Sequence, residues 1–298
     1  MSSPISNYPN GITSFGIPII GGGSIPISLN ANYYFVDGKH GSDSGTAGLS
    51  PANAFATIGQ ANTVCGARVN WANTRWAVND VIVIAPGVYT ENLTTMSHGC
   101  IYYGLGWDNR DGQFGVKFKP ASGAVVDVGS LINSAFFNIG FETAETDASD
   151  RVFDSTVTNN CLFQNCWFSG PAETATAVGF YASDCTRTKF INCEFTCLDV
   201  GMDIVYADAN DKFAHCLVDG CNFMQIDTAG IRVSANLVGP SSIITRSNFL
   251  GAGQTLGIAV DDNAGGILDV TWCAAESTSG YTNCRSVNAS YNNGALVT

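Results

Sequence analysis

The sequence predicts an all-β fold, a single-stranded right-handed parallel β-helix, and two observations support this prediction. The first is a repeated phrase of a turn residue, a cysteine, any residue and a phenylalanine, found as NCWF, NCEF and GCNF. Its phenylalanine belongs to a longer series with steps of 27, 27, 28 and 26 residues: Phe141, Phe168, Phe195, Phe223 and Phe249. A period of this length is typical of a solenoid, in which each repeat covers the face that its neighbour leaves open.

The second observation is a two-residue alternation, which indicates strands rather than helices. Within the phrase, Cys166 and Phe168 flank the outward-facing Trp167. Another short alternating segment follows each phenylalanine after a gap of varying length, so each coil has a fixed part and a variable loop. This pattern predicts about seven coils with a period of about 27 residues. A β-sandwich is the alternative, and it explains the in-phase columns less well.

Two columns of the repeat have a specific expected environment. The Asn138, Asn165 and Asn192 column should lie at a corner, since asparagine tolerates positive φ and its amide can bond to the like amide one coil away. The Cys166, Cys193 and Cys221 column should be a ladder of small, buried, reduced thiols.

Composition limits the partners. The chain has 25 acidic residues against 13 Lys and Arg, a formal charge of −12, and 3 histidines. A field of this sign disfavours nucleic acid and anionic membranes as partners. A zinc site would need two converging pairs of ligands, whereas the pairs Cys161/Cys166 and Cys216/Cys221 fall on β corners of stacked coils. We therefore predict no metal and no cofactor.

The N-terminal part divides at about residue 32. From Met1 to Val36 the sequence has no Asp, Glu, Lys or Arg, which suggests an arm (1–32) that lies on another surface. The alternative is a strand that folds back on its own β-helix. Residues 33–298 form the β-helix domain, with a cap helix near 51–65 that Ser50 and Pro51 would begin. Such a helix would plug the open end of the solenoid.

Two stretches carry a family resemblance. The segments YYFVDGKHGSDSGTAGLSPANAFATIGQA and NDVIVIAPGVYTENL resemble the opening of right-handed β-helix proteins of the pectate-lyase-like superfamily. The arm segment NYPNGITSFGIPI resembles the openings of tailed-phage virion proteins that continue into a β-helix, and this resemblance covers Asn7 to Leu105.

The phage resemblance implies a role, a partner and a location. It implies a head decoration (cement) protein on the capsid surface of the virion, assembled in the host cytoplasm, with the major capsid protein as partner. It also favours a homo-oligomer, in particular a trimer. The arm residues that would dock on the capsid are Tyr8, Pro9, Asn10, Gly11, Phe15, Ile17, Pro18, Ile19 and Ile20.

The best candidate for chemistry is the pair Asp203 and Arg232, expected to be outward neighbours on adjacent coils. They would lie on the face where enzymes of this superfamily bind sugar. The equivalent outward positions of other coils are expected at Phe153, Gly179 and Ala259, which add no third polar group.

Two further acids, Asp199 and Asp227, are expected in the variable loop nearby. Because loop acids are usually only solvated, we expect a structural protein without enzymatic activity. The alternative is a tail-spike-type protein that binds or depolymerises bacterial surface polysaccharide, with a host glycan as partner and Asp203 and Arg232 in its site.

Overall fold

The structure is a computed structural model of the whole chain. It describes residues 12–14, 17–20, 31–45, 47–68, 80–106, 108, 115–144, 150–171, 177–205, 212–234, 237–238, 242–250, 256–260, 268–276, 281–282, 284, 286–288, 290–292 and 295–297. Within these ranges no helix is long and apolar enough to cross a membrane.

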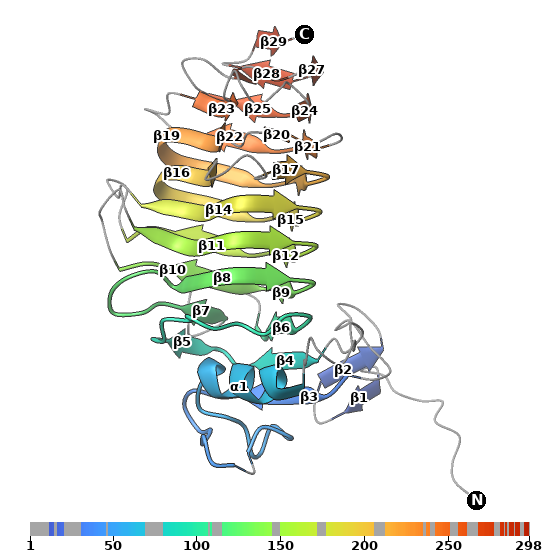
Figure 1. Cartoon of the computed structure of the whole chain (residues 1–298), viewed down its shortest axis with the longest axis vertical. Coiled ribbons are helices and arrows are strands. Elements are labelled where there is room, and N and C mark those ends of the chain that lie inside the picture. The colour runs from blue at the N-terminus through green and yellow to red at the C-terminus, as the bar shows by residue number, and fades with distance from the viewer. Residues whose placement is uncertain are drawn as a thin grey trace, which may run out of the picture.

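One sheet of ten strands shows the parallel β-helix directly, because its strands stack in chain order (Figure 1). Each strand pairs in parallel with the strand of the next coil. The strands are β3 (Tyr33–Val36), β4 (Val81–Ile84), β6 (Ile101–Gly104), β9 (Ala135–Phe137), β12 (Leu162–Gln164), β15 (Lys189–Ile191), β18 (Leu217–Asp219), β21 (Ser242–Thr245), β24 (Leu268–Thr271) and β27 (Ser286–Asn288).

A second sheet of seventeen strands forms the other two faces of the solenoid. Its strands are β5 (Gly87–Tyr89), β7 (Val116–Phe118), β8 (Val126–Ile132), β10 (Ile139–Glu142), β11 (Arg151–Asn159), β13 (Trp167–Ser169), β14 (Val178–Thr186), β16 (Glu194–Val205), β17 (Lys212–Ala214), β19 (Asn222–Ser234), β20 (Leu237–Val238), β22 (Asn248–Leu250), β23 (Leu256–Val260), β25 (Ala274–Ala275), β26 (Tyr281–Thr282), β28 (Ser290–Asn292) and β29 (Ala295–Val297). We call β8, β11, β14, residues 200–205 of β16, residues 229–234 of β19 and β23 the long-strand face.

The predicted fold class and period are therefore confirmed, with a different number of coils. The 27-residue spacing holds along β9, β12, β15, β18 and β21, where Phe136, Phe163, Phe190, Val218 and Ile244 are in register. The ten-stranded sheet continues beyond these strands in both directions through coils of other lengths. The regular 27-residue spacing covers fewer coils than the seven predicted, and the complete ten-stranded sheet covers more.

The asparagine column occupies the expected corner. Asn138, Asn165 and Asn192 have φ values of 57°, 53° and 51°, and the Asn165 amide donates to Asn138 Oδ1 at 3.2 Å. Residues of other types take the same conformation in later coils: Gly220, Arg246 and Trp272. A second corner with positive φ was not foreseen, and it consists of Asn133, Asn160, Arg187 and His215.

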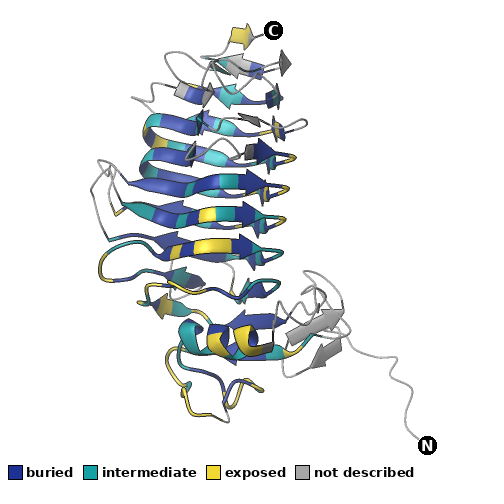
Figure 2. Ribbon diagram, in the orientation of Figure 1, coloured by how far each residue is buried: buried dark blue, intermediate teal, exposed yellow. Residues whose placement is uncertain are grey.

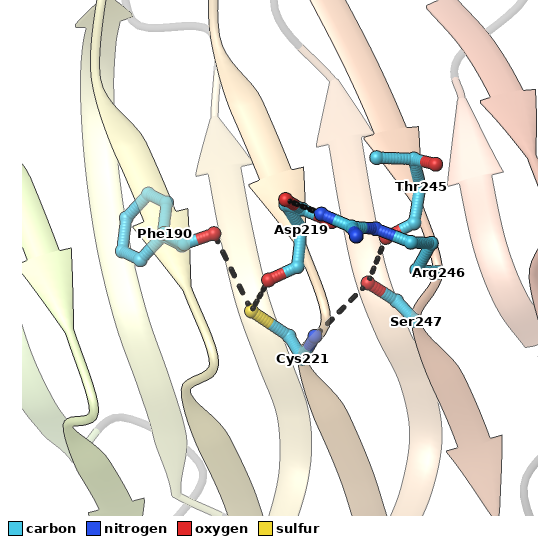
Figure 3. A network of polar contacts seen from close by, with 6 residues as sticks. All are labelled: Phe190, Asp219, Cys221, Thr245, Arg246 and Ser247. Carbon is cyan, nitrogen blue, oxygen red and sulfur yellow. Dashed lines mark hydrogen bonds and ion pairs between the residues drawn. The ribbon is translucent and has the colours of Figure 1, made fainter.

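The thiol column is also confirmed. Cys166, Cys193 and Cys221 are buried and free, and Ser247 and Cys273 continue the column. Cys221 illustrates the arrangement: its Sγ donates to the carbonyls of Phe190 and Asp219 at 3.5 and 3.6 Å (Figure 3). Beside the column the rings of Phe168, Phe195, Phe223 and Phe249 stack with centroids 4.7 Å apart.

The cap helix exists but begins later than predicted. Helix α1 spans Ile58–Arg68, while Ser50 forms an antiparallel bridge with Asn53 in the preceding turn. Thr57 caps the helix through its Oγ1, which accepts from Gln60 N–H at 3.1 Å. Glu91 accepts from the first two helical N–H groups at 2.8 Å each. The helix closes the end of the solenoid, because Ile58, Ala61 and Cys65 join its main core.

The arm is described only in part. Strands β1 (Ile12–Ser14) and β2 (Ile17–Ile20) form an antiparallel pair. The expected docking residues Tyr8, Pro9, Asn10, Gly11 and Phe15 lie outside the described residues, and Ile17, Pro18, Ile19 and Ile20 are described only as the strand β2. Docking on a capsid therefore stays a prediction.

Candidate functional site

A row of polar side chains runs along the outside of the long-strand face. The pairing register aligns one residue from each of six neighbouring coils: Asp127, Asp154, Tyr181, Asp203, Arg232 and Ala259. We call this series the polar row. Stacked coils place its members roughly 4.8 Å apart along the solenoid axis.

This register corrects the sequence alignment. The prediction that Asp203 and Arg232 are neighbours on adjacent coils is confirmed, and Ala259 is their equivalent. Phe153, however, is fully buried and lies in an inward column with Phe180 and Met202.

Gly179 faces inward as well, since a Cβ there would lie 2.8 Å from Leu198 Cδ1. Two consecutive residues, Gly179 and Phe180, thus face the core, and the alternation slips by one position. The claim that the face offers no third polar group is therefore wrong.

Asp203 and Arg232 form a bidentate ion pair. Arg232 Nε donates to Asp203 Oδ1 at 2.8 Å and Nη2 donates to Oδ2 at 2.5 Å. Asp203 is only 3% exposed, whereas the Arg232 side chain is 40% exposed. The hydrogen bond from Arg232 to Asp203 raises the pKa of the guanidinium, and the charge of Asp199 adds to this. The pair thus presents its cation outward and keeps its carboxylate inside.

Asp154 occupies a different environment two coils away. Burial raises the pKa of its carboxyl, the hydrogen bond from Arg151 opposes that shift, and the charge of Asp127 adds to it. Arg151 Nη1 donates to Asp154 Oδ2 at 2.7 Å, and its guanidinium carbon lies 3.2 Å from the centroid of the Tyr181 ring. The Arg151 side chain therefore connects the acid to the aromatic residue between the two carboxylates.

An apolar strip lies beside the polar row. Val178, Val200 and Ala229 are buried in a small cluster that is separate from the solenoid core, and Tyr181 packs against them. They follow Arg151 in the same outward column. The face therefore combines an apolar strip, an aromatic ring, two arginines and several carboxylates.

Asp199 and Asp227 lie at the corner next to this strip, within β16 and β19 rather than in a loop as expected. Thr228 Oγ1 donates to Asp199 Oδ1. Burial raises the pKa of Asp227, and the charge of Asp199 adds to this shift. Asp199 and Asp227 therefore add negative charge at the edge of the long-strand face that borders the apolar strip.

The sequence reasoning missed Asp127, Arg151, Asp154 and Tyr181. A usable signal existed: in each coil the polar residue directly follows a large inward residue, as in Phe153-Asp154, Phe180-Tyr181, Met202-Asp203 and Ile231-Arg232. Across the described parts of the chain, no three His, Cys, Asp or Glu side chains are grouped so that they could hold a metal ion.

Comparisons with known proteins bear on the fold. No family model matches the chain, and neither does any curated protein. The solved pectin methylesterase of Aspergillus niger matches with a TM-score of 0.51 and 16% identity, covering 90% of this chain and 86% of that chain. The pectin methylesterase of Erwinia chrysanthemi covers 92% of both chains with 14% identity and a TM-score of 0.49. The Aspergillus match supports the β-helix fold expected from the superfamily resemblance.

These matches also correct one expectation. The prediction of a chain without enzymatic activity is contradicted, because the solved structure that matches with a TM-score of 0.51 is a pectin methylesterase, which is an enzyme. Neither structure is a phage virion protein, so the virion assignment stays a prediction.

Proposed function

We propose that the chain is a polysaccharide-acting hydrolase whose substrate lies along the polar row. The single observation behind this proposal is that two carboxylates in different environments, Asp154 and Asp203, flank Tyr181 on one outward row. A pair of carboxyl groups on one surface is the usual acid and base of glycan hydrolysis, and burial raises the pKa of Asp154, which suits the acid. A linear row repeated at every coil suits an extended polymer better than a compact ligand.

The proposed roles follow from the contacts of each group. Both oxygens of Asp203 accept from Arg232 and the residue is only 3% exposed, so it takes the proton of an attacking water when the Arg232 side chain turns toward the substrate. Asp154, whose pKa is raised by burial, donates its proton to the leaving oxygen. Arg232, whose side chain is 40% exposed, donates hydrogen bonds to hydroxyl or carboxylate groups of the bound polymer. The water loses one proton and the leaving group gains one, so the step balances.

The bond that is cut follows from two considerations. Two coil steps separate the Cα atoms of Asp154 and Asp203 by about 10 Å, and the carboxyl groups of inverting glycosidases lie about 6.5 to 9.5 Å apart, so the two side chains need to lean toward each other. The Aspergillus neighbour, by its name, removes methyl esters from pectin. We favour cleavage of a glycosidic bond in a bacterial surface polysaccharide, and ester hydrolysis is the outcome that an assay must distinguish.

The test measures two products from the same reactions. Bacterial surface polysaccharide and methyl-esterified pectin are incubated with the protein, and reducing ends and methanol are quantified. Asp203→Asn and Asp154→Asn should each lower the rate by about 10² to 10⁴. Asp219→Asn is the matched control, because Arg246 binds Asp219 in the same bidentate manner at a corner away from the row. Equal rates for Asp203→Asn and Asp219→Asn would refute the proposed site.

A location on a phage particle is a separate proposal. It is supported by the resemblance of residues 7–105 to tailed-phage virion proteins, and a polysaccharide hydrolase on a particle would belong on the tail, as a spike. Immunogold labelling of purified particles tests it, since label on heads or on no particle would contradict a tail position.

A further inference from the structure

The ten-stranded sheet is apolar on its outer face in its first four strands, β3, β4, β6 and β9. The inward residues of these strands enter the main core. The outward residues form two registered columns, Tyr33–Val81–Ile101–Ala135 and Phe35–Val83–Tyr103–Phe137. They make up a second hydrophobic cluster that is separate from the core. An outward sheet face of this composition is typical of a parallel sheet that is covered on both sides.

The exposure of this face changes along the solenoid. Val81 and Val83 are 0% and 1% exposed, as low as core residues. In the same outward column as Val81, Leu162 and Leu217 are half-buried, and Ile243 is 38% exposed. The cover is therefore confined to the first coils. Buried residues, in dark blue, run through the strands of the whole solenoid, including those at the β3 end (Figure 2).

Described residues explain only part of this cover. Outside the four strands, the side chains that belong to the cluster are those of Ala31, Ala54 and Leu105, two of which are single methyl groups. They are too few and too small to close two columns of valine, isoleucine and aromatic residues. The described apolar side chains therefore leave room for a further segment on this face.

The N-terminal arm joins the chain at this face. Asn32 N–H donates to Asp80 Oδ1 at 2.9 Å, and Val81 N–H donates to the Asn32 carbonyl at 2.8 Å. The β1–β2 hairpin lies at the β3 end of the solenoid (Figure 1). Residues 1–30 carry no charged side chain, so the arm can enter an apolar surface without burying an unpaired charge.

We propose that residues 1–30 lie across the outer face of β3, β4 and β6 of their own chain. A tethered segment reaches this face at a high effective concentration, which favours it over a second copy of the chain. The arm then acts as a strap over the first coils, and its apolar residues are occupied within the molecule. An arm that folds back on its own β-helix is the alternative given above for residues 1–32. The proposal does not depend on the proposed hydrolase activity.

The experiment measures thiol alkylation at an introduced cysteine by peptide mass spectrometry. Val83→Cys probes the covered part of the face, and Ile243→Cys is the control on the same face beyond the strap. Each is labelled in the full chain and in a chain that lacks residues 1–30. In the full chain, Val83→Cys should react at least about tenfold more slowly than Ile243→Cys, and the truncation should remove this protection. Ile243→Cys should react equally in both chains.

A second variant guards against misfolding of the truncated chain. Ile17→Asp with Ile19→Asp, in the full-length protein, should expose Val83→Cys to the reagent because burying two carboxylates is unfavourable. Protection that persists in both altered chains would overturn the proposal, since another segment would then cover the face. Sedimentation measures dimerisation in parallel. Protection that appears only at concentrations where the protein dimerises would also overturn the proposal, because a second copy of the chain would then cover the face.

Discussion

Replacing Phe195 by alanine should show how much one ring contributes to the stacked core. Phe195 is fully buried, and its ring stacks on both Phe168 and Phe223 with centroids 4.7 Å apart. A buried phenylalanine-to-alanine change lowers the free energy of unfolding by about 3 to 5 kcal/mol, because apolar burial is lost and a cavity remains. Two stacked partners place this site near the upper end, since each aromatic pair adds about 0.5 to 1.5 kcal/mol. We therefore expect a loss of about 4 to 5 kcal/mol in the free energy of unfolding.

The measurement is equilibrium unfolding in guanidinium chloride, followed by far-ultraviolet circular dichroism. Trp272→Ala is the control, because this side chain is large and aromatic but 70% exposed, and its loss should change stability by less than about 0.5 kcal/mol. A loss below about 1 kcal/mol for Phe195→Ala would show that the rings do not form a close-packed column.

Three further predictions concern the corners, the thiols and the proposed acid. Asn192→Val should cost about 1 to 2 kcal/mol because φ is 51°, whereas Asn192→Gly should be nearly neutral, as thermal unfolding would show. Cys193 and Cys221 should resist alkylation at neutral pH, because burial raises the pKa of both thiols; rapid labelling of the native protein would contradict this. Burial raises the pKa of Asp154, so hydrolysis should fall as pH rises through that pKa, and Asp154→Asn should abolish this limb of the pH–rate profile. The same shift makes the folded state bind more protons, so the contribution of Asp154 to stability decreases as pH rises above the ordinary aspartate range.

The repeat made the fold predictable because its strongest constraints are local to each coil. Asn165 and Asn192 mark a corner that needs positive φ, and Phe168 and Phe195 mark the adjacent inward position. The second corner was missed because only two of its four residues share a side-chain type: two asparagines are followed by an arginine and a histidine. A backbone requirement that several residue types meet leaves only a short run of the same letter, which was two asparagines at the second corner and three at the first.

The helix start and the polar row were mispredicted for a different reason, since both depend on contacts distant in sequence. Thr57 is a poor signal by itself, and the Glu91 carboxylate that completes the helix N-terminus comes from a later coil. In the polar row, two adjacent residues that both face the core shifted the alternation by one position at Gly179. Only the strand pairing shows that Tyr181 and Asp154 continue the series that begins at Arg232.

The fold itself does not require the ion pair at the centre of the row. The same outward column accepts an aromatic ring at Tyr181, so its geometry tolerates an uncharged side chain. Removing a carboxylate from water is expensive, and apolar residues of similar volume often stabilise a protein as well as a buried pair or better. Asp203 is nearly inaccessible, whereas the corner pair of Asp219 and Arg246 achieves the same bidentate contact with a largely exposed arginine. A chain that needed only an ion pair between coils could therefore place it at the corner. Burial of Asp203 on the same outward row as Asp154, whose pKa is raised by burial, is therefore the reason for proposing chemistry at this face.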